Sequence, residues 1–236
     1  MTGPGGEGPQ GARRPPGGGP AMAEAEDGAV DGAMDGAVAA VLERYHRRMR
    51  REREERQSGG LGEDWRDRHL LAVGPATGRL LNILARSLEA PTILEIGTSF
   101  GYSGIWLAEA ARATGGRLIT LELAAHKQAQ AREMAEAAGL AASIDFRLGD
   151  AVALIGALEC RVDLVLLDLW KDLYVPCLEA LLPKLNPGAI LVADNMIRPP
   201  SEGARAYGAR VRSLPGVGSL LLPVGSGIEV SRFPGG

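Results

Sequence analysis

Apolar and polar positions follow two alternating patterns from residue 93 onward. Short, almost continuous apolar runs predict buried strands at 93–96, 118–121, 164–167 and 189–193, and a further strand is predicted at 144–148. Between them, segments rich in helix-forming residues predict helices at 103–113, 125–138, 151–157, 174–184 and 202–213. Strands that alternate with helices in this way indicate an α/β fold, with a parallel sheet, right-handed crossovers and helices on both faces.

The end of the chain has a different pattern. Two short strand-like segments, 219–223 and 228–231, lie on either side of Gly225-Ser226-Gly227. Two strands separated by a short glycine-containing turn are typical of a hairpin. The sheet is therefore expected to end in an antiparallel pair.

The segment before the sheet predicts an amphipathic helix. Its apolar face consists of Val38, Val41, Leu42, Tyr45 and Met49. The opposite face carries arginines interleaved with glutamates, which indicates either RNA binding or a solvated helix stabilised by ion pairs and packed on the domain or on a partner subunit. The interleaved acids favour the second interpretation. Another amphipathic helix is predicted over 77–88.

Residues 1–37 are rich in Gly, Pro and Ala and contain almost no large apolar side chain. Such a segment cannot bury enough surface to offset its chain entropy, so we expect a disordered tail followed by one domain over 38–236. The repeat Asp-Gly-Ala-Val/Met within 27–38 is interpreted as low complexity, because it lacks the nonapeptide period of calcium-binding arrays.

Composition narrows the class of protein. The chain has 236 residues, of which 45% are hydrophobic, and a net charge of −3, which argues against a protein built mainly to bind nucleic acid. No apolar run is as long as the ~18 residues that a membrane span needs. The N-terminal segment lacks the apolar core of a signal peptide. The two cysteines of the chain imply no disulfide framework. We therefore expect a cytoplasmic protein with no membrane or nucleic-acid partner.

The first predicted strand leads into a glycine turn and then a helix, which is a cradle for a small molecule. Glycine lets the backbone approach a ligand, and the first helical N–H groups point at it. The spacing Glu95-x-Gly97-x-x-x-Gly101-Tyr102-Ser103 breaks the fingerprint for a dinucleotide and favours a nucleoside without a diphosphate. S-adenosylmethionine is the common ligand of this kind. Gly97, Ser99 and Gly101 are thus predicted to bind the cofactor, although glycine turns also occur without a ligand.

Two acids follow the next two predicted strands. Glu122 lies 25 residues after Gly97, near the offset at which a carboxylate accepts hydrogen bonds from both ribose hydroxyls. The alternative is that Glu122 is a solvent-exposed acid at the end of a strand. Asp150 stands before Ala151, where it either accepts from the adenine amino group or caps the next helix.

Polar residues also follow the fourth and fifth predicted strands, which we expect to be neighbours. Asp168 follows the fourth, and Asp194 and Asn195 follow the fifth. Carboxylate and amide oxygens suit Mg²⁺, although Asp and Asn are also common in loops. Two such loops on adjacent strands beside a nucleoside site predict a magnesium centre.

Two further residues in the fourth loop are candidates. Lys171 lies three residues after Asp168, close enough to act as a general base on an acceptor hydroxyl, or it is an ordinary loop lysine. Trp170 either walls the adenine or packs in the core.

Together these residues resemble the magnesium-dependent O-methyltransferase family, which includes catechol and caffeoyl-CoA O-methyltransferases. The resemblance runs from residue 70 to 233, and three motifs and one acid carry it: Glu95-x-Gly97-x-x-x-Gly101-Tyr102-Ser103, Asp168-x-Trp170-Lys171-Asp172-x-Tyr174, Ala193-Asp194-Asn195 and Glu122. It implies a Rossmann-like class I methyltransferase fold, with a mostly parallel seven-stranded sheet that ends in an antiparallel hairpin.

The resemblance also implies roles for individual residues. Asp168, Asp194 and Asn195 would bind Mg²⁺ or another divalent cation, and Lys171 would deprotonate the acceptor hydroxyl. Residues implied to line the cofactor site are Val73, Glu95, Ser103, Glu122, Asp150, Ala151 and Asp168. A homodimer is expected by analogy with the family.

The sequence therefore predicts a Mg²⁺-dependent O-methyltransferase that transfers a methyl group from S-adenosylmethionine to a small catechol-like or vicinal-diol acceptor. One alternative is a metal-independent methyltransferase acting on nitrogen or on RNA, which would leave Asp194 and Asn195 unexplained. Another is a non-catalytic interaction protein on a methyltransferase scaffold, which would be expected not to bind the methyl donor.

Overall fold

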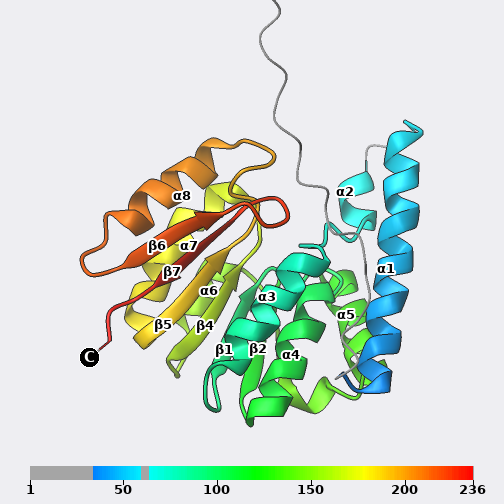
Figure 1. Cartoon of the computed structure of the whole chain (residues 1–236), viewed down its shortest axis with the longest axis horizontal. Helices are drawn as coiled ribbons and strands as arrows, with labels where there is room; N and C mark the ends of the chain where they lie inside the picture. Colours follow the sequence, from blue (N-terminus) through cyan, green and yellow to red (C-terminus); the bar gives the residue numbers. More distant parts are fainter. Residues whose placement is uncertain (1–33, 60–63, 236) are drawn as a thin grey trace, which may run out of the picture.

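The computed structural model describes residues 34–59 and 64–235, and its centre is a seven-stranded sheet with the strand order β3-β2-β1-β4-β5-β7-β6 (Figure 1). The strands are β1 (Thr92–Ile96), β2 (Arg117–Glu122), β3 (Ile144–Leu148), β4 (Val162–Leu167), β5 (Leu185–Ala193), β6 (Gly218–Leu222) and β7 (Ile228–Arg232). The first five are parallel, and β7 pairs antiparallel with both β5 and β6. The predicted fold class and the closing hairpin are confirmed.

Helices cover both faces of the sheet (Figure 1). One core contains residues of α1 (Gly36–Gln57), α3 (Pro75–Arg86), α4 (Tyr102–Thr114) and α5 (Ala125–Ala137). The other contains residues of α6 (Ala151–Gly156), α7 (Tyr174–Leu181) and α8 (Glu202–Arg212). A short helix, α2 (Trp65–Arg68), lies between α1 and α3 in the sequence.

From Leu164 to Leu167, the side chains of β4 alternate between the two cores. In β4, Leu164 and Leu166 face the core under α3 and α4, whereas Val165 and Leu167 face the core under α7. Successive side chains of a strand point to opposite faces, so a strand apolar at every position must be covered on both sides. This alternation decides which way the residues just beyond each strand point.

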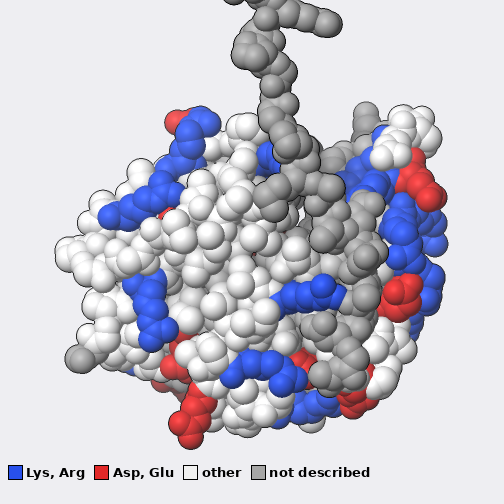
Figure 2. Space-filling model, in the orientation of Figure 1, with Lys and Arg blue, Asp and Glu red and all other residues white. Residues whose placement is uncertain are grey.

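Helix α1 begins two residues before the predicted domain boundary, since Asp35 caps it by accepting from the N–H of Ala37 at 2.9 Å. The last unit of the tetrapeptide repeat is therefore the start of a helix, and residues 1–33, most of the predicted tail, lie outside the described residues. On the outer face Arg47 and Arg50 both pair with Glu43. Figure 2 shows acids interleaved with the basic residues of α1, as the ion-pair interpretation predicted.

Two boundaries differ from the prediction around residues 182–188. The predicted helix 174–184 ends as α7 at Leu181 and continues as a 3₁₀ turn, Leu182–Lys184, where Pro183 has no N–H to donate. Asn186-Pro187-Gly188, expected as a loop, lies within β5. The register of β4 and β5 shifts between Val162 and Leu164, and such an irregularity is where a strand tolerates proline.

Candidate active site

The predicted site residues converge on the carboxyl ends of the five parallel strands. The glycine turn follows β1, Glu122 ends β2, Asp150 follows β3, and Asp168 and Asp194 directly follow β4 and β5. In open parallel sheets this edge is where ligands bind. The topology therefore places the predicted nucleoside cradle and the acidic loops on one edge, with β1 and β4 as direct neighbours.

The glycine turn brings the cofactor cradle into contact with the β4 loop. Gly97 has a φ of +104°, and a Cβ there would collide with the carbonyl oxygen of Asp168. Gly101, at φ +92°, is the residue before α4, and a Cβ there would collide with Ala131 of α5. Only glycine fits at either position, so the turn positions Asp168 as well as the predicted ligand.

Glu122 holds the turn in place. Its Oε2 accepts from the main-chain N–H of Ser99 at 2.7 Å, and its Oε1 accepts from Leu123 at 2.9 Å and Ala124 at 2.8 Å. Ser99 has a φ of +47°, an uncommon conformation for a residue other than glycine. The carboxylate therefore fixes a strained turn, and its remaining lone pairs are the ones available to ribose hydroxyls.

Glu95 is fully buried beneath the turn. Burial raises its pKa to about 7, although hydrogen bonds from Ser103 and Thr120 favour the charged form. The hydroxyl of Thr120 donates to its Oε2 at 2.5 Å, and Thr98 contacts the same hydroxyl. Its Oε1 makes no hydrogen bond within the described residues. An unpaired carboxylate oxygen at this depth fits a residue that lines a polar ligand.

The remaining predicted cofactor residues are placed as follows. Asp150 caps α6 by accepting from the N–H of Ala153 at 2.9 Å, so its capping role is confirmed, and contact with adenine stays a prediction for it and for its neighbour Ala151. Val73 is buried directly before α3.

The alternative that Trp170 packs in the core is wrong. Trp170 directly precedes the 3₁₀ turn Lys171–Leu173, and its backbone is extended. Its exposed fraction is 62%.

Asp168 and Asp194 are neighbours by register. Leu167 pairs with Ala193 across β4 and β5, both contribute to the core under α7, and the next residue of each strand therefore turns to the opposite face. Asn195 follows with a φ of +52°, which asparagine tolerates better than most residues. The structure thus brings together the two loops that the sequence predicted to meet.

The electrostatics of Asp194 fit a cation. The residue is buried, and burial together with the charge of Asp168 raises its pKa to about 7. Its Oδ1 makes no hydrogen bond in the described part of the chain. Over the same residues, no group of three or more His, Cys, Asp or Glu side chains is arranged to hold an ion. The set Asp168, Asp194 and Asn195 is of another kind, two carboxylates and an amide, and these oxygen donors suit Mg²⁺.

Lys171 points its amine at the same place. Its Nζ lies 3.6 Å from Oδ1 of Asp168 and donates to the carbonyl oxygen of Leu169 at 3.1 Å. Burial lowers the pKa of Lys171, while Asp168 and Asp194 oppose that shift. Burial likewise raises the pKa of Asp168, which the lysine opposes. A buried amine whose pKa is lowered is suited to accept a proton.

Sequence reasoning missed two residues that support the site. The hydroxyl of Tyr174 lies within donating distance of the carbonyl oxygens of Leu167 and Asp194, at the ends of β4 and β5, and accepts from Nζ of Lys171. Its position three residues after Lys171, one helical turn away, was the available signal. The hydroxyl of Tyr45, on α1, donates to the carbonyl oxygen of Phe100 in the glycine turn at 2.6 Å. A contact 55 residues apart has no local sequence signal.

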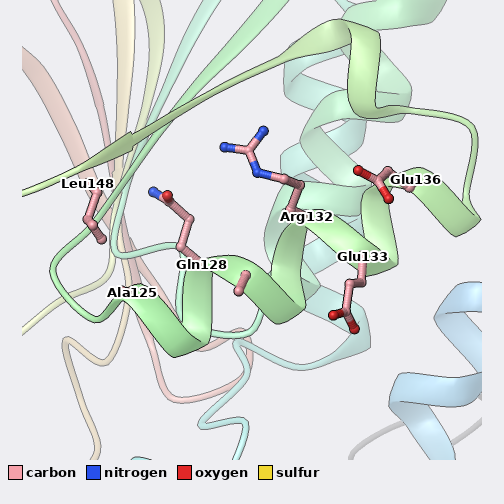
Figure 3. A pocket seen from close by; sticks show the side chains of 7 residues that line it. Ala125, Gln128, Arg132, Glu133, Glu136 and Leu148 are labelled. Atoms are coloured by element: carbon pink, nitrogen blue, oxygen red, sulfur yellow. The ribbon is translucent and has the colours of Figure 1, made fainter.

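A separate hollow lies on α5. Its volume is about 350 Å³, and its lining is Ala125, Gln128, Ala129, Arg132, Glu133, Glu136 and Leu148. In Figure 3, Gln128 and Arg132 extend from the same side of α5. None of the predicted cofactor, metal or catalytic residues lines this hollow, so it is distinct from the site at the strand ends.

Comparison with known proteins identifies the family. The profile of an O-methyltransferase family matches residues 65–201, more than half of the chain. This chain belongs to that O-methyltransferase family. A catechol O-methyltransferase of Niastella koreensis is 33% identical over 180 residues, which cover 70% of this chain and 80% of that protein.

Solved structures of related enzymes agree with this assignment. The O-methyltransferase from Bacillus cereus, in complex with SAH, has a TM-score of 0.67 and 26% identity, and the match covers 86% of this chain and 93% of that one. The O-methyltransferase TomG from Streptomyces achromogenes, in complex with SAM, has a TM-score of 0.67 and 27% identity, with 86% and 91% covered. The predicted enzyme class, an S-adenosylmethionine-dependent O-methyltransferase, is confirmed.

No helix in the described ranges is both long and apolar enough to cross a membrane.

Proposed function

We propose that this O-methyltransferase uses Mg²⁺, held by Asp168, Asp194 and Asn195, to methylate one hydroxyl of a small catechol-like or vicinal-diol acceptor. The observation that carries the proposal is the unpaired Oδ1 of Asp194, buried next to Asp168 and Lys171 at two neighbouring strand ends. A buried carboxylate oxygen without a partner is costly, and a bound cation would remove that cost.

The methyl donor would occupy the cradle beside this centre. Glu122 presents its carboxylate at the end of β2, and the glycine turn after β1 contacts the backbone of Asp168. The donor would therefore have its ribose end near Glu122 and its sulfonium end near the acidic loops. The catechol O-methyltransferase relative and the SAM-bound neighbour support this choice of acceptor class and donor.

Magnesium, when bound, supplies positive charge that lowers the pKa of an acceptor hydroxyl and helps to orient it. The protein's own residues do the rest. Asp168 and Asp194 would hold the cation at the strand ends, and the buried amine of Lys171 lies within reach of a hydroxyl placed beside Asp168. Two vicinal hydroxyls suit such a centre better than one, because both oxygens can approach the same point.

The methyl group passes from sulfur to oxygen in a single displacement. The O–H bond of the acceptor breaks, its proton passes to the lone pair of Lys171 Nζ, and the oxygen electron pair forms the new O–CH₃ bond. The S–CH₃ bond breaks at the same carbon, and its electron pair stays on sulfur, which leaves neutral S-adenosylhomocysteine. Positioning of the two reactants and neutralisation of their opposite charges supply most of the rate enhancement.

The test is methyl transfer from S-adenosylmethionine to catechol and to resorcinol, each with Mg²⁺ or with EDTA. We expect a methyl ether from catechol with Mg²⁺, none with EDTA, and recovery when Mg²⁺ is restored. Resorcinol is the matched control, since its hydroxyls lie too far apart to share one ion. Turnover of catechol that persists in EDTA would contradict the metal, and equal rates for the two diols would contradict the vicinal-diol class.

A further inference from the structure

Tyr174 connects three parts of the catalytic centre through one hydroxyl. This fully buried residue begins α7 and belongs to the core under that helix. Its hydroxyl lies 2.5 Å from Nζ of Lys171, 2.9 Å from the carbonyl oxygen of Leu167 and 3.0 Å from the carbonyl oxygen of Asp194. It therefore contacts the end of β4, the end of β5 and the lysine at the same time.

The directions of these hydrogen bonds follow from the donor count. A phenol has one proton, and main-chain carbonyl oxygens only accept. The proton of Tyr174 is therefore donated to the carbonyl of Leu167 or of Asp194, and the phenol oxygen must accept from Nζ of Lys171. The lysine is the donor in this contact, and the tyrosine sets the direction of one of its N–H bonds.

The geometry of the amine then leaves one direction open. Apart from its bond to Cε, Nζ has three tetrahedral positions. One donates to the carbonyl of Leu169 at 3.1 Å and a second donates to Tyr174. The third faces Asp168, whose Oδ1 is 3.6 Å away. In the neutral amine the two N–H bonds satisfy Leu169 and Tyr174, and the lone pair takes the third position.

We propose that Tyr174 is a positioning residue that aims the lone pair of Lys171 at the acceptor hydroxyl beside Asp168. This rests on the proposed function, in which Lys171 is the base. Without the phenol oxygen, Leu169 is the only hydrogen-bond partner left, so Nζ can shift toward Asp168 and turn its remaining N–H to that carboxylate. The base would still be present, but its lone pair would no longer point at the proton it must accept.

Tyr174→Phe tests this, with Tyr207→Phe as the matched control. Tyr207 is fully buried on α8, and its ring meets that of Tyr174 edge-on, with the ring centroids 5.5 Å apart. Its hydroxyl makes no hydrogen bond within the described residues. With catechol, Mg²⁺ and S-adenosylmethionine, we expect Tyr174→Phe to lower kcat roughly 100-fold, the cost of a misplaced catalytic group, while KM for the donor stays unchanged. Tyr207→Phe should stay near wild type. Equal losses in the two variants would overturn the proposal.

A second background separates positioning from simple damage to the fold. In Lys171→Met, which has no amine to aim, adding Tyr174→Phe should cause no further loss of kcat. A further loss as large as that in the wild-type background would overturn the proposal, because it would show that Tyr174 acts independently of the lysine.

A structural readout decides the point without turnover. In a crystal structure of Tyr174→Phe, Nζ of Lys171 should have left the position between Leu169 and Asp168 that it holds in the wild type. An unmoved Nζ would overturn the proposal. If the wild type fails to methylate catechol with Mg²⁺, the proposed function fails, whereas the position of Nζ in the two structures still decides the role of Tyr174.

Discussion

The main-chain N–H of Asp194 donates to the carbonyl oxygen of Leu167 at 3.1 Å, which extends the β4–β5 ladder by one residue beyond the end of β5. Through this bond the residue after β5 is held beside Asp168, the residue after β4. The two carboxylates are therefore placed by backbone pairing inside a rigid sheet. A site built in this way can bury like charges side by side, and burial together with the charge of Asp168 raises the pKa of Asp194.

Lys171→Met should separate chemistry from binding. We expect kcat for catechol methylation to fall between about 100-fold and 10,000-fold, the range for loss of a general base, because the variant keeps the apolar stem and loses the amine. The Kd for S-adenosylmethionine, measured by calorimetry, should stay within about twofold, since the lysine is not assigned to the cradle. Lys184→Met, a half-buried lysine bonded to the carbonyl of Leu158, is the control. A parallel loss of donor binding in Lys171→Met would refute this assignment.

Glu122→Gln should weaken binding of the methyl donor. Both oxygens of the carboxylate accept hydrogen bonds, from three main-chain N–H groups in all. In glutamine one of these oxygens is replaced by an NH₂ group, which cannot accept from the N–H that it faces. Loss of charged hydrogen bonds of this kind costs about 1.5–3 kcal/mol each, so Kd for S-adenosylhomocysteine should rise at least about tenfold. Calorimetry measures it, with Glu133→Gln on α5 as the control. An unchanged Kd would show that the end of β2 does not bind the nucleoside.

The sheet was predictable from the sequence because strands buried on both faces, such as Leu164–Leu167, leave an unmistakable apolar run. The convergence of Asp168 and Asp194 followed from the same pattern, since parallel strands end at one edge. Contacts through side chains were not predictable. The apolar and aromatic character of Tyr174 and Trp170 does not reveal that one is fully buried under Lys171 and the other is exposed, because the path of the loop decides this.

Glu95 should make the stability of the protein fall as pH rises. Its pKa is 4.5 in an unfolded chain and about 7 in the native state. Between these values the unfolded chain has released the proton and the native state retains it, so the free energy of unfolding declines by about 3 kcal/mol in total and levels off above pH 7. Below pH 4.5 both states are protonated, and the contribution is fully present.

Urea denaturation of the wild type and Glu95→Gln in EDTA, at several pH values from 4.5 to 7, isolates this contribution. Asp194 also has a raised pKa and adds a decline to both proteins. The wild type should therefore lose stability relative to the variant across this window. A difference between them that does not change with pH would contradict the raised pKa of Glu95.

Tyr45→Phe should loosen the glycine turn from outside the cradle. The variant leaves the buried carbonyl of Phe100 without its partner, at a cost of about 1–3 kcal/mol in the free energy of unfolding. Because Phe100 lies between Ser99 and Gly101, we also expect weaker binding of S-adenosylmethionine. Tyr102→Phe is the control, since that hydroxyl contacts His46 and not the turn. Loss of stability with unchanged donor affinity would mean that α1 supports the fold but not the cradle.

The most direct measurement is the affinity of the S-adenosylhomocysteine-bound enzyme for Mn²⁺, followed by electron paramagnetic resonance, in wild type, Asp194→Asn and Asp172→Asn. Asp172 is the control because it is an exposed acid in the same loop region. We predict that the wild type binds the ion, that Asp172→Asn matches it, and that Asp194→Asn is weakened at least about tenfold. Equal affinity in all three proteins, or no binding by the wild type, would contradict the metal centre.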